Sequence, residues 1–506
     1  MQGGEAVENL LNTELVAQDS NGVLGARLAE TVPTVENGLW KVFPDGRMET
    51  TWKIRADARW HDATPFTADD LVFTARLVMD RELGVFRVAI FDSVEGVEAL
   101  DARTVVVKWK RTHIYADTPF QGPATPYPRH LLEKDYLEKD RAGFLSVPYW
   151  GPALVGTGPF RLKEFVPGSH VLLQANDDYV LGRPKIDEIV VKFIPDASTL
   201  IANILAGAVE MTIGRNVSLD EAIQVRDQYR AGRVEVGPAN WIAIYPQFLN
   251  PNPAIVADVR FRRALMHALD RQTMVDTLQA GFGSVAHSLI PPEEPEFQGV
   301  ERNVVRYEYD PRKASELVAQ LGYVKGPDGV FRDRSNEPLA IEIRTRTQPD
   351  QQKPMLAAVD YWKAIGLSVN PHTTTAAEAV DRQFRANFPA FELAGGGRNT
   401  LDGLAEVRIS EVPLPSNNYV GANTQRYANA ELDDLAERYF TTVPKRERAE
   451  LAARALAHIS EQLVWMGVYL RVEPAFMANR LVNVYPRRQP APGGIHVWNA
   501  HEWDLK

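Results

Sequence analysis

Apolar and polar residues alternate along several short stretches of the chain, and each such stretch predicts a β-strand. Residues 51–55 (TWKIR) alternate with a period of two. Residues 156–166 and 170–177 predict a strand pair, because Pro167 and Gly168 between them favour a turn. A turn and a strand are predicted over 99–109, and the other predicted strands are 186–194, 209–214, 339–345 and 367–373.

Helices are predicted where an apolar periodicity near 3.6 follows a capping residue. Thr67 and Asp70 fit a capping box, so a helix is expected to begin at Ala68 and run to Asp80. Asp310, Pro311 and Gly322 have the positions of an N-cap, a first-turn proline and a C-terminal glycine. Further helices are predicted from Asp196 to near Gly207, over 258–281 and 353–366, and as a pair within 430–464; residues 111–150 are predicted to be irregular.

The order of these elements predicts an α/β protein with two α/β bodies. Residues 186–214 read strand, helix, strand, which is typical of a βαβ unit on a parallel sheet. Residues 339–373 repeat that order, and a mixed segment precedes the first body. A chain of 506 residues is long enough for two to four domains. Two bodies of this kind favour a small-molecule site between lobes.

Composition narrows the class of protein. The net charge is −10 and the pI is about 5.6, which argues against a nucleic-acid partner. The absence of cysteine excludes disulfides, thiolate metal sites and cysteine nucleophiles. The amino terminus lacks the basic and apolar regions of a signal peptide, so the protein is expected to be cytoplasmic or to have been trimmed.

His61 and Asp62 are the one pair that suggests an enzyme, a hydrolase with His61 as general base. No His-Glu-x-x-His or Gly-x-Ser-x-Gly motif accompanies the pair. Adjacent residues of an extended segment point to opposite sides, so Asp62 is not expected to orient the ring of His61. We expect Asp62 to bond backbone amides of a turn, with Trp60 and Phe66 packed in a core.

Aromatic side chains mark the passage from the first body to the second. Trp241, Tyr245 and Phe248 lie on residues 241–253 (WIAIYPQFLNPNP). Aromatic faces at such a crossing suit the apolar surface of a ligand. Core packing is an equally good interpretation for each of these residues.

Four blocks of sequence then resemble a known family. Residues 56–73 (ADARWHDATPFTADDLVF), with Arg55 before them, resemble its Trp-His-Asp-Gly-x-Pro-Phe-Thr-Ala segment. Residues 155–211, 258–283 and 309–323 resemble its Val-Gly-Thr-Gly-Pro, Val-Arg-x-Ala-Leu and Tyr-Asp-Pro-x-Lys-Ala blocks, in the same order. The chain is therefore similar to the family 5 extracellular solute-binding proteins, the oligopeptide- and dipeptide-binding proteins of ABC importers.

The resemblance implies a periplasmic-binding-protein-like Venus flytrap, with two lobes, three domains and a two-segment hinge. Domain I would comprise residues 1–10, 158–246 and 477–506, domain II residues 11–157, and domain III residues 247–476. It implies a non-enzymatic receptor that encloses a peptide or peptide-sized solute between the lobes and delivers it to an ABC importer permease. A monomer with no cofactor, no metal and no nucleic-acid partner is expected.

The chain departs from the family pattern in two places. First, the family normally has a strand and a Leu-Asp-Pro segment before the part that matches residues 1–12. A signal peptide or lipid anchor would precede that segment, so we expect a periplasmic or extracellular protein, tethered through a segment absent here. Second, a family Trp-x-x-Asp stretch supplies a carboxylate for a peptide's amino terminus, whose burial unpaired would be costly. The matching positions here are Leu393 and Gly396, and Asp402 is the nearest carboxylate.

Because of these departures, more than one class of ligand and more than one role are candidates for this protein. A sugar or an opine in the same fold is the alternative to a peptide, and a signalling receptor with this fold is the alternative to an importer component. The glycines at 395–397 allow backbone to approach a ligand closely. The residues predicted to contact the ligand are Trp241, Tyr245, Gln247, Arg398, Asn399, Asp402 and Phe476.

Overall fold

Two strands carry the chain between the two units into which it folds. The computed structural model describes residues 4–213, 217–291, 299–396, 400–487 and 496–506. Unit 1 comprises Met1–Gly237 and Glu473–Lys506, and unit 2 comprises Pro238–Val472. The strands β10 (Gly232–Pro246) and β17 (Met466–Ala478) contain the two junctions and are neighbours in one sheet. All helices in the described ranges are too short or too polar to cross a membrane.

The described residues of unit 1 contain a four-stranded sheet, a three-stranded sheet, two large hydrophobic cores and a small third core around Phe476. One large core is built from residues between 15 and 149, and the other joins residues 6–11 to 160–175 and 475–503. The division of this region into domains I and II stays a prediction. The strands are β1 (Val16–Gln18), β2 (Leu24–Ala26), β3 (Trp40–Val42), β4 (Met48–Lys53), β5 (Val94–Asp101), β6 (Thr104–Trp109), β7 (Phe160–Val166), β8 (His170–Ala175), β9 (Glu188–Lys192), β18 (Leu481–Val482) and β19 (Asp504–Leu505).

The helices of unit 1 confirm the capping box predicted at Thr67 and correct the prediction made for residues 111–150. The helix α2 begins at Ala68, and the Thr67 N–H donates to the Asp70 carboxylate at 2.9 Å, as a capping box requires. Residues 111–150 were predicted to be irregular. This prediction is wrong, because these residues include the helix α3, which buries one face through Leu132 and Tyr136. The α-helices are α1 (Gly4–Leu11), α2 (Ala68–Met79), α3 (Arg129–Glu138), α4 (Arg141–Phe144), α5 (Ala197–Leu205) and α6 (Leu219–Arg226).

The parallel βαβ unit predicted over residues 186–214 is also wrong. The strands β7, β8 and β9 form an antiparallel sheet, in agreement with the turn predicted at Pro167 and Gly168. Residues 209–213 contribute only one isolated bridge, from Met211 to Met477. The second strand of the expected unit therefore does not form beside β9.

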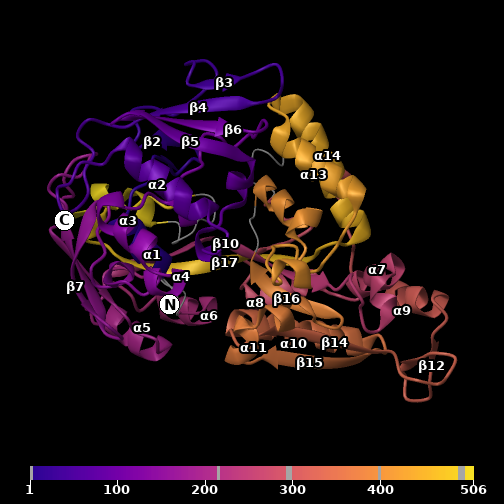
Figure 1. The fold of residues 1–506 in the computed structure, drawn as a ribbon. Helices are drawn as coiled ribbons and strands as arrows, with labels where there is room; N and C mark the ends of the chain where they lie inside the picture. The colour runs from indigo at the N-terminus through magenta and orange to yellow at the C-terminus, as the bar shows by residue number, and fades with distance from the viewer. Residues whose placement is uncertain (1–3, 214–216, 292–298, 397–399, 488–495) are drawn as a thin grey trace. The chain divides into compact units, whose positions relative to one another are not determined.

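Unit 2 is built on a six-stranded mixed sheet, in the order β11-β17-β10-β16-β14-β15 (Figure 1). The strand β14 is parallel to both β15 and β16, and α10 connects β14 to β15. This confirms the βαβ unit predicted over 339–373. The strands of unit 2 are β11 (Ser284–Val285), β12 (Val324–Lys325), β13 (Phe331–Arg332), β14 (Ala340–Arg346), β15 (Ser368–Thr374) and β16 (Phe391–Gly396).

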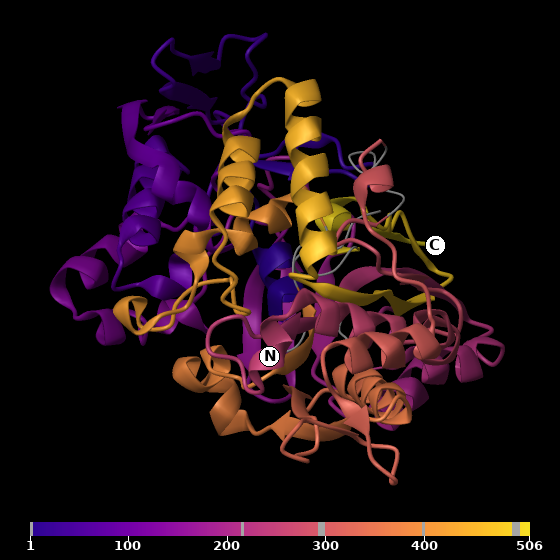
Figure 2. The same cartoon turned by 90° about the vertical axis from the view of Figure 1, so that its right-hand side faces the viewer.

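Two helices replace the single helix predicted over 258–281. The chain bends after His267, and Asp270 caps the second helix by accepting the Thr273 N–H at 3.0 Å. The predicted pair at the carboxyl side is confirmed as α13 and α14, which lie side by side (Figure 2). The helices are α7 (Val259–His267), α8 (Arg271–Leu278), α9 (Pro311–Gln320), α10 (Pro349–Ala364), α11 (Ala376–Val380), α12 (Arg382–Ala386), α13 (Ala430–Thr441) and α14 (Lys445–Gln462).

His61 and Asp62 belong to the scaffold of unit 1. The Gly156 N–H donates to His61 Nδ1 at 3.1 Å, so Nε2 carries the proton and donates to the Gly158 carbonyl at 3.1 Å. Burial lowers the pKa of His61 to about 4. Asp62 does not bond this ring; it accepts the Thr64 N–H at 3.0 Å and lies 2.7 Å from His130 Nε2. The two side chains therefore serve different contacts, as their adjacency predicted.

The buried neutral ring makes folding stability depend on pH. Because the pKa of His61 falls from 6.5 in the unfolded chain to about 4, the unfolded state binds more protons between these values. The contribution of the neutral His61 ring to the free energy of unfolding is therefore fully present above pH 6.5. This contribution is lost as the pH falls toward 4. We expect the wild type to lose about 2 kcal/mol more than His61→Gln between pH 7.5 and pH 5. Urea unfolding at both pH values measures this difference.

The comparison is internally controlled, because burial also lowers the pKa of His287 and His501, and both variants retain these residues. His170→Gln, which leaves the buried ring and the Asp62–His130 pair in place, serves as the matched control and should keep the wild-type pH dependence. Equal losses of stability in the wild type and His61→Gln would contradict the prediction.

Candidate functional site

The sheet of unit 2 has one apolar face and one face that carries aromatic and charged side chains. Successive side chains of a strand point to opposite faces, and residues opposite each other in neighbouring strands share a face. Ile242, Ile343 and Leu393 belong to the apolar core. The registers place Tyr245 opposite Glu392, and Glu392 opposite Arg344. We call the second face the polar face; it comprises Trp241, Ala243, Tyr245, Gln247, Arg344, Arg346, Glu392 and Ala394.

Arg344 is the buried charge at the centre of the polar face. Its side chain is 2% exposed, and Nη2 donates to the Glu392 carboxylate at 2.8 Å. It also donates to the carbonyls of Phe384 at 3.0 Å and Arg385 at 2.6 Å. The guanidinium lies over the rings of Phe384 and Phe388, 5.0 and 4.8 Å from their centres. Arg344 thus holds the carboxyl end of α12 over the sheet.

Gln247, which directly follows β10, holds the same segment. The side chain is fully buried, and its Nε2 donates to the carbonyls of Ala386 and Phe388, both at 3.1 Å. Its Oε1 accepts the Leu249 N–H and Arg426 Nε, both at 3.1 Å. Both donors and the acceptor of this amide are therefore engaged inside unit 2. Its predicted contact with ligand stays a prediction, and these bonds give it a structural role.

Arg426 adds a third connection to the segment after α12. Besides Gln247, its guanidinium donates to Asn387 Oδ1 at 2.9 Å and to the Leu249 carbonyl at 3.2 Å. Burial lowers the pKa of Arg426. Arg344, Gln247 and Arg426 together fix the position of α12, although they lie far apart in sequence.

Trp241 and Tyr245 share the polar face and are both buried. Trp241 packs edge-on against Trp465, with ring centres 5.6 Å apart. Burial raises the pKa of Tyr245, the charge of Glu406 adds to that effect, and a hydrogen bond with Trp241 opposes it. The structure therefore brings these two predicted residues together on one face of the sheet, where their side chains interact.

The carboxyl ends of the parallel strands form the edge at which α/β sheets usually bind ligands. The strands β14, β15 and β16 end at Arg346, Thr374 and Gly396. At this side of unit 2 Arg471 donates to Asn240 Oδ1 at 3.1 Å and pairs with Asp350 in the first turn of α10. The Arg471 side chain is 7% exposed and that of Asp350 38%, so the carboxylate is the accessible member of this pair.

The remaining predicted site residues lie elsewhere. Asp402 is half-buried in a 3₁₀ helix, Leu401–Val407, which Leu404 and Val407 anchor in the core. Phe476 is 1% exposed in a core of unit 1, where it packs edge-on against Tyr229. Arg398 and Asn399 lie outside the described residues. The ligand contacts predicted for all of these residues stay predictions.

Four arginines and one ion pair of unit 2 were not predicted from the sequence. Arg344 and Arg346 are two residues apart in a predicted strand, which was a signal that they share a face. Arg382 and Arg385 are three apart on α12, where charge ordinarily indicates a solvated surface. The Asp350–Arg471 pair spans 121 residues, so no local pattern indicates it.

The role of Gln247 gives a stability prediction. Gln247→Leu removes the acceptor of Arg426 and the donor of two buried carbonyls, so we expect unit 2 to lose about 2–4 kcal/mol. Urea unfolding followed by tryptophan fluorescence measures the loss. Gln383→Leu, at an exposed position of α12, is the matched control and should change stability by less than about 0.5 kcal/mol. Equal midpoints for the two variants would contradict the structural role.

Comparison with known proteins identifies the fold. The oligopeptide-binding protein AppA of Bacillus subtilis (strain 168) is 26% identical over 517 residues, covering 99% of this chain and 87% of that protein. The oligopeptide-binding protein of Thermus thermophilus, solved with a pentapeptide, superposes with a TM-score of 0.82 at 24% identity and covers 99% of this chain and 92% of its own. AgaA from A. tumefacien R10, solved with agropinic acid, has a TM-score of 0.77 at 19% identity. The match covers 100% of this chain and 94% of that of AgaA.

These similarities confirm the predicted two-lobed Venus flytrap fold of periplasmic solute-binding proteins. The model of the bacterial extracellular solute-binding proteins, family 5, matches residues 30–405, which is most of the chain. The four blocks that carried the resemblance lie within this span. The chain therefore belongs to the bacterial extracellular solute-binding proteins of family 5.

Proposed function

We propose that this protein is an extracytoplasmic receptor that captures a peptide or peptide-sized solute and delivers it to an ABC importer. One observation carries the proposal. Within the span that matches the family, the sheet of unit 2 has a second face of aromatic and charged side chains, opposite the face that packs in the core. Aromatic groups bind the apolar parts of such a ligand, and ionic groups bind its ends.

A peptide is the first candidate because the similar proteins from B. subtilis and T. thermophilus are named oligopeptide-binding proteins. A non-peptide solute such as a sugar or an opine is the second candidate, which the similarity to AgaA with agropinic acid supports. On the polar face we propose Trp241 and Tyr245 as contacts for apolar parts of the ligand, and we propose Asp402 as the partner of an amine.

A hydrolase that uses His61 is the third candidate, and the geometry does not support it. Both ring nitrogens of His61 are engaged by Gly156 and Gly158, and Asp62 bonds other groups. A general base needs a free nitrogen within reach of its substrate. We therefore propose a non-enzymatic protein. We further propose that it is a monomer, periplasmic or extracellular and tethered to the membrane, with the importer permease as its partner.

Asp402 provides the test of the peptide proposal. An ammonium group that leaves water needs a carboxylate partner, so Asp402→Asn should weaken peptide binding about 10- to 100-fold. Calorimetry with trialanine and N-acetyl-trialanine separates the amine from the rest of the peptide. The wild type should prefer the free amine, and Asp402→Asn should bind both peptides alike.

Asp434→Asn is the matched control, because Asp434 lies on the exposed side of α13 and its side chain is 62% exposed. It should bind as the wild type does. If the wild type binds no peptide of two to five residues, the peptide proposal fails, and sugars and opines become the ligands to test. Loss of hydrolytic turnover in a folded His61→Ala variant would instead favour the enzyme.

A further inference from the structure

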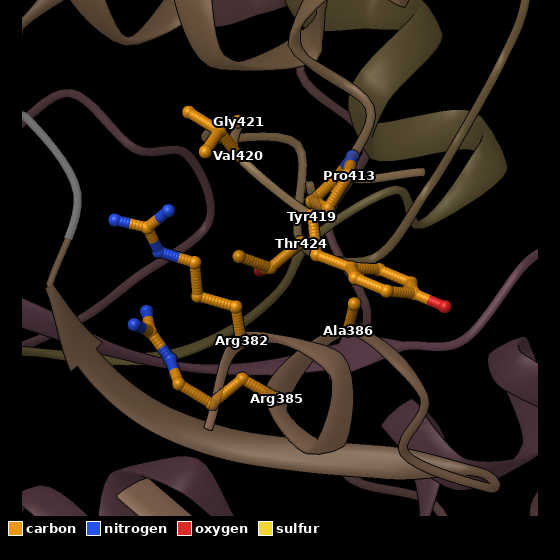
Figure 3. Close-up of a pocket in the computed structure, with 8 residues that line it drawn as sticks. All are labelled: Arg382, Arg385, Ala386, Pro413, Tyr419, Val420, Gly421 and Thr424. Carbon is orange, nitrogen blue, oxygen red and sulfur yellow. The ribbon is translucent and has the colours of Figure 1, made fainter. Parts of the chain in front are cut away.

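A small pocket in unit 2 has two arginines on one side. It has a volume of about 190 Å³ and lies between α12 and residues 413–424. Figure 3 shows the guanidinium groups of Arg382 and Arg385 extending in the same direction, with Tyr419 on the other side. A cavity of roughly 150 Å³ holds one benzene-sized molecule. This pocket can therefore take one head group of a ligand, and it is too small for a peptide.

Neither guanidinium has a hydrogen bond or an ion pair with another group in the described part of the chain. Arg382 and Arg385 are three residues apart on α12, which places them on one face. Partial burial lowers the pKa of Arg385, the charges of Arg346, Arg344 and Arg382 lower it further, and the charge of Glu392 opposes this shift. Both arginines are exposed, so water screens the repulsion between them, and a bound anion would reduce it further.

The acidic groups near the pocket already have partners. Glu392 binds Arg344, and Asp381 caps α12 by accepting the Phe384 N–H at 3.0 Å. The buried carboxylate of Glu411 accepts the Ala422 N–H at 3.3 Å. None of these three forms an ion pair with Arg382 or Arg385 in the described residues. Glu392 acts on Arg385 through its charge, but none of these acids bonds either arginine of the pocket in the described residues.

The pocket is held in shape before any ligand binds. Arg344 and Gln247 bond the carbonyls at the end of α12, and Arg426 bonds Asn387. On the other wall Gly421 lies against Glu411, where an added Cβ would come within 2.1 Å of the Glu411 carbonyl. Thr424 adds a hydroxyl to the lining. A preorganised site loses less entropy on binding than two freely moving arginines would.

We propose that Arg382 and Arg385 bind a dianionic head group of the transported solute, a phosphate monoester or a dicarboxylate. Each guanidinium offers two parallel N–H groups, which match the oxygen pairs of both anions. Arg346 adds a third positive charge nearby. Three cations that form no ion pair among the described residues favour a doubly charged group over a single carboxylate. This inference rests on the proposed receptor function and specifies part of its ligand.

Calorimetry at low ionic strength tests the site with small probes. Comparing the binding of glycerol 3-phosphate with that of glycerol tests for a phosphate monoester. Comparing the binding of succinate with that of succinamide tests for a dicarboxylate. One dianion of the two should bind the wild type and its neutral partner should not. Arg382→Gln with Arg385→Gln should weaken that binding about 100-fold, and Arg385→Lys, which keeps charge without the paired donors, about 10-fold.

The matched control removes the same charge elsewhere in unit 2. Arg438→Gln with Arg446→Gln changes two exposed helix residues that have weak ion pairs at 3.5 and 3.6 Å. It should bind the dianion within about twofold of the wild type, because surface ion pairs contribute little. Equal weakening in both double variants would show a general charge effect and overturn the site.

Trialanine, measured on the same proteins, separates this inference from the proposed function. Peptide binding that persists in a wild type without affinity for either dianion would overturn the arginine site and leave the receptor standing. Dianion binding that is lost in Arg382→Gln/Arg385→Gln, without peptide binding, would support the site and remove the peptide as ligand. A wild type that binds neither dianion contradicts the inference in every case.

Discussion

The arrangement of the polar face depends on one buried cation, Arg344. A charge that leaves water costs several kcal/mol unless it is paired and hydrogen-bonded. Arg344 meets this requirement with one carboxylate, Glu392, and with two carbonyls at the end of α12. Because the carbonyls belong to a separate segment, satisfying the charge also fixes where that segment lies. The ion pair therefore specifies a structure, whatever its net contribution to stability.

The two faces of the unit 2 sheet follow from the alternation along β10 and β14. Ile242 and Ile244 enter the core, and Trp241, Ala243 and Tyr245, which alternate with them, turn to the other face. Once one face is fixed by its core, a shift of one residue in register would move the whole apolar set to the polar face. The positions of Trp241, Tyr245 and Arg344 are thus determined by the hydrophobic core on the opposite side.

The elements that could be predicted from the sequence are those whose cause is local. The capping box of α2 and the Asp310–Pro311 start of α9 formed as expected, because their partners are three residues away or fewer. The βαβ unit of unit 2 also formed, because its strands have strong alternation. The one expected in unit 1 did not, since nothing in residues 209–213 indicates which strand they pair with. The bonds of Gln247 reach residues more than 130 positions away, so its burial could not be foreseen.

Buried arginines in unit 2 show why the pair on α12 is different. Arg262 and Arg271 have no acidic partner at bonding distance in the described residues, yet each donates to several backbone carbonyls. Burial lowers the pKa of both to about 10, and each guanidinium is satisfied by the fold itself. Within the described ranges Arg382 and Arg385 have no such carbonyls and remain at the mouth of a shaped pocket. The fold satisfies these structural arginines with its own carbonyls, and it leaves Arg382 and Arg385 exposed on one face of α12, where an anion can bind both.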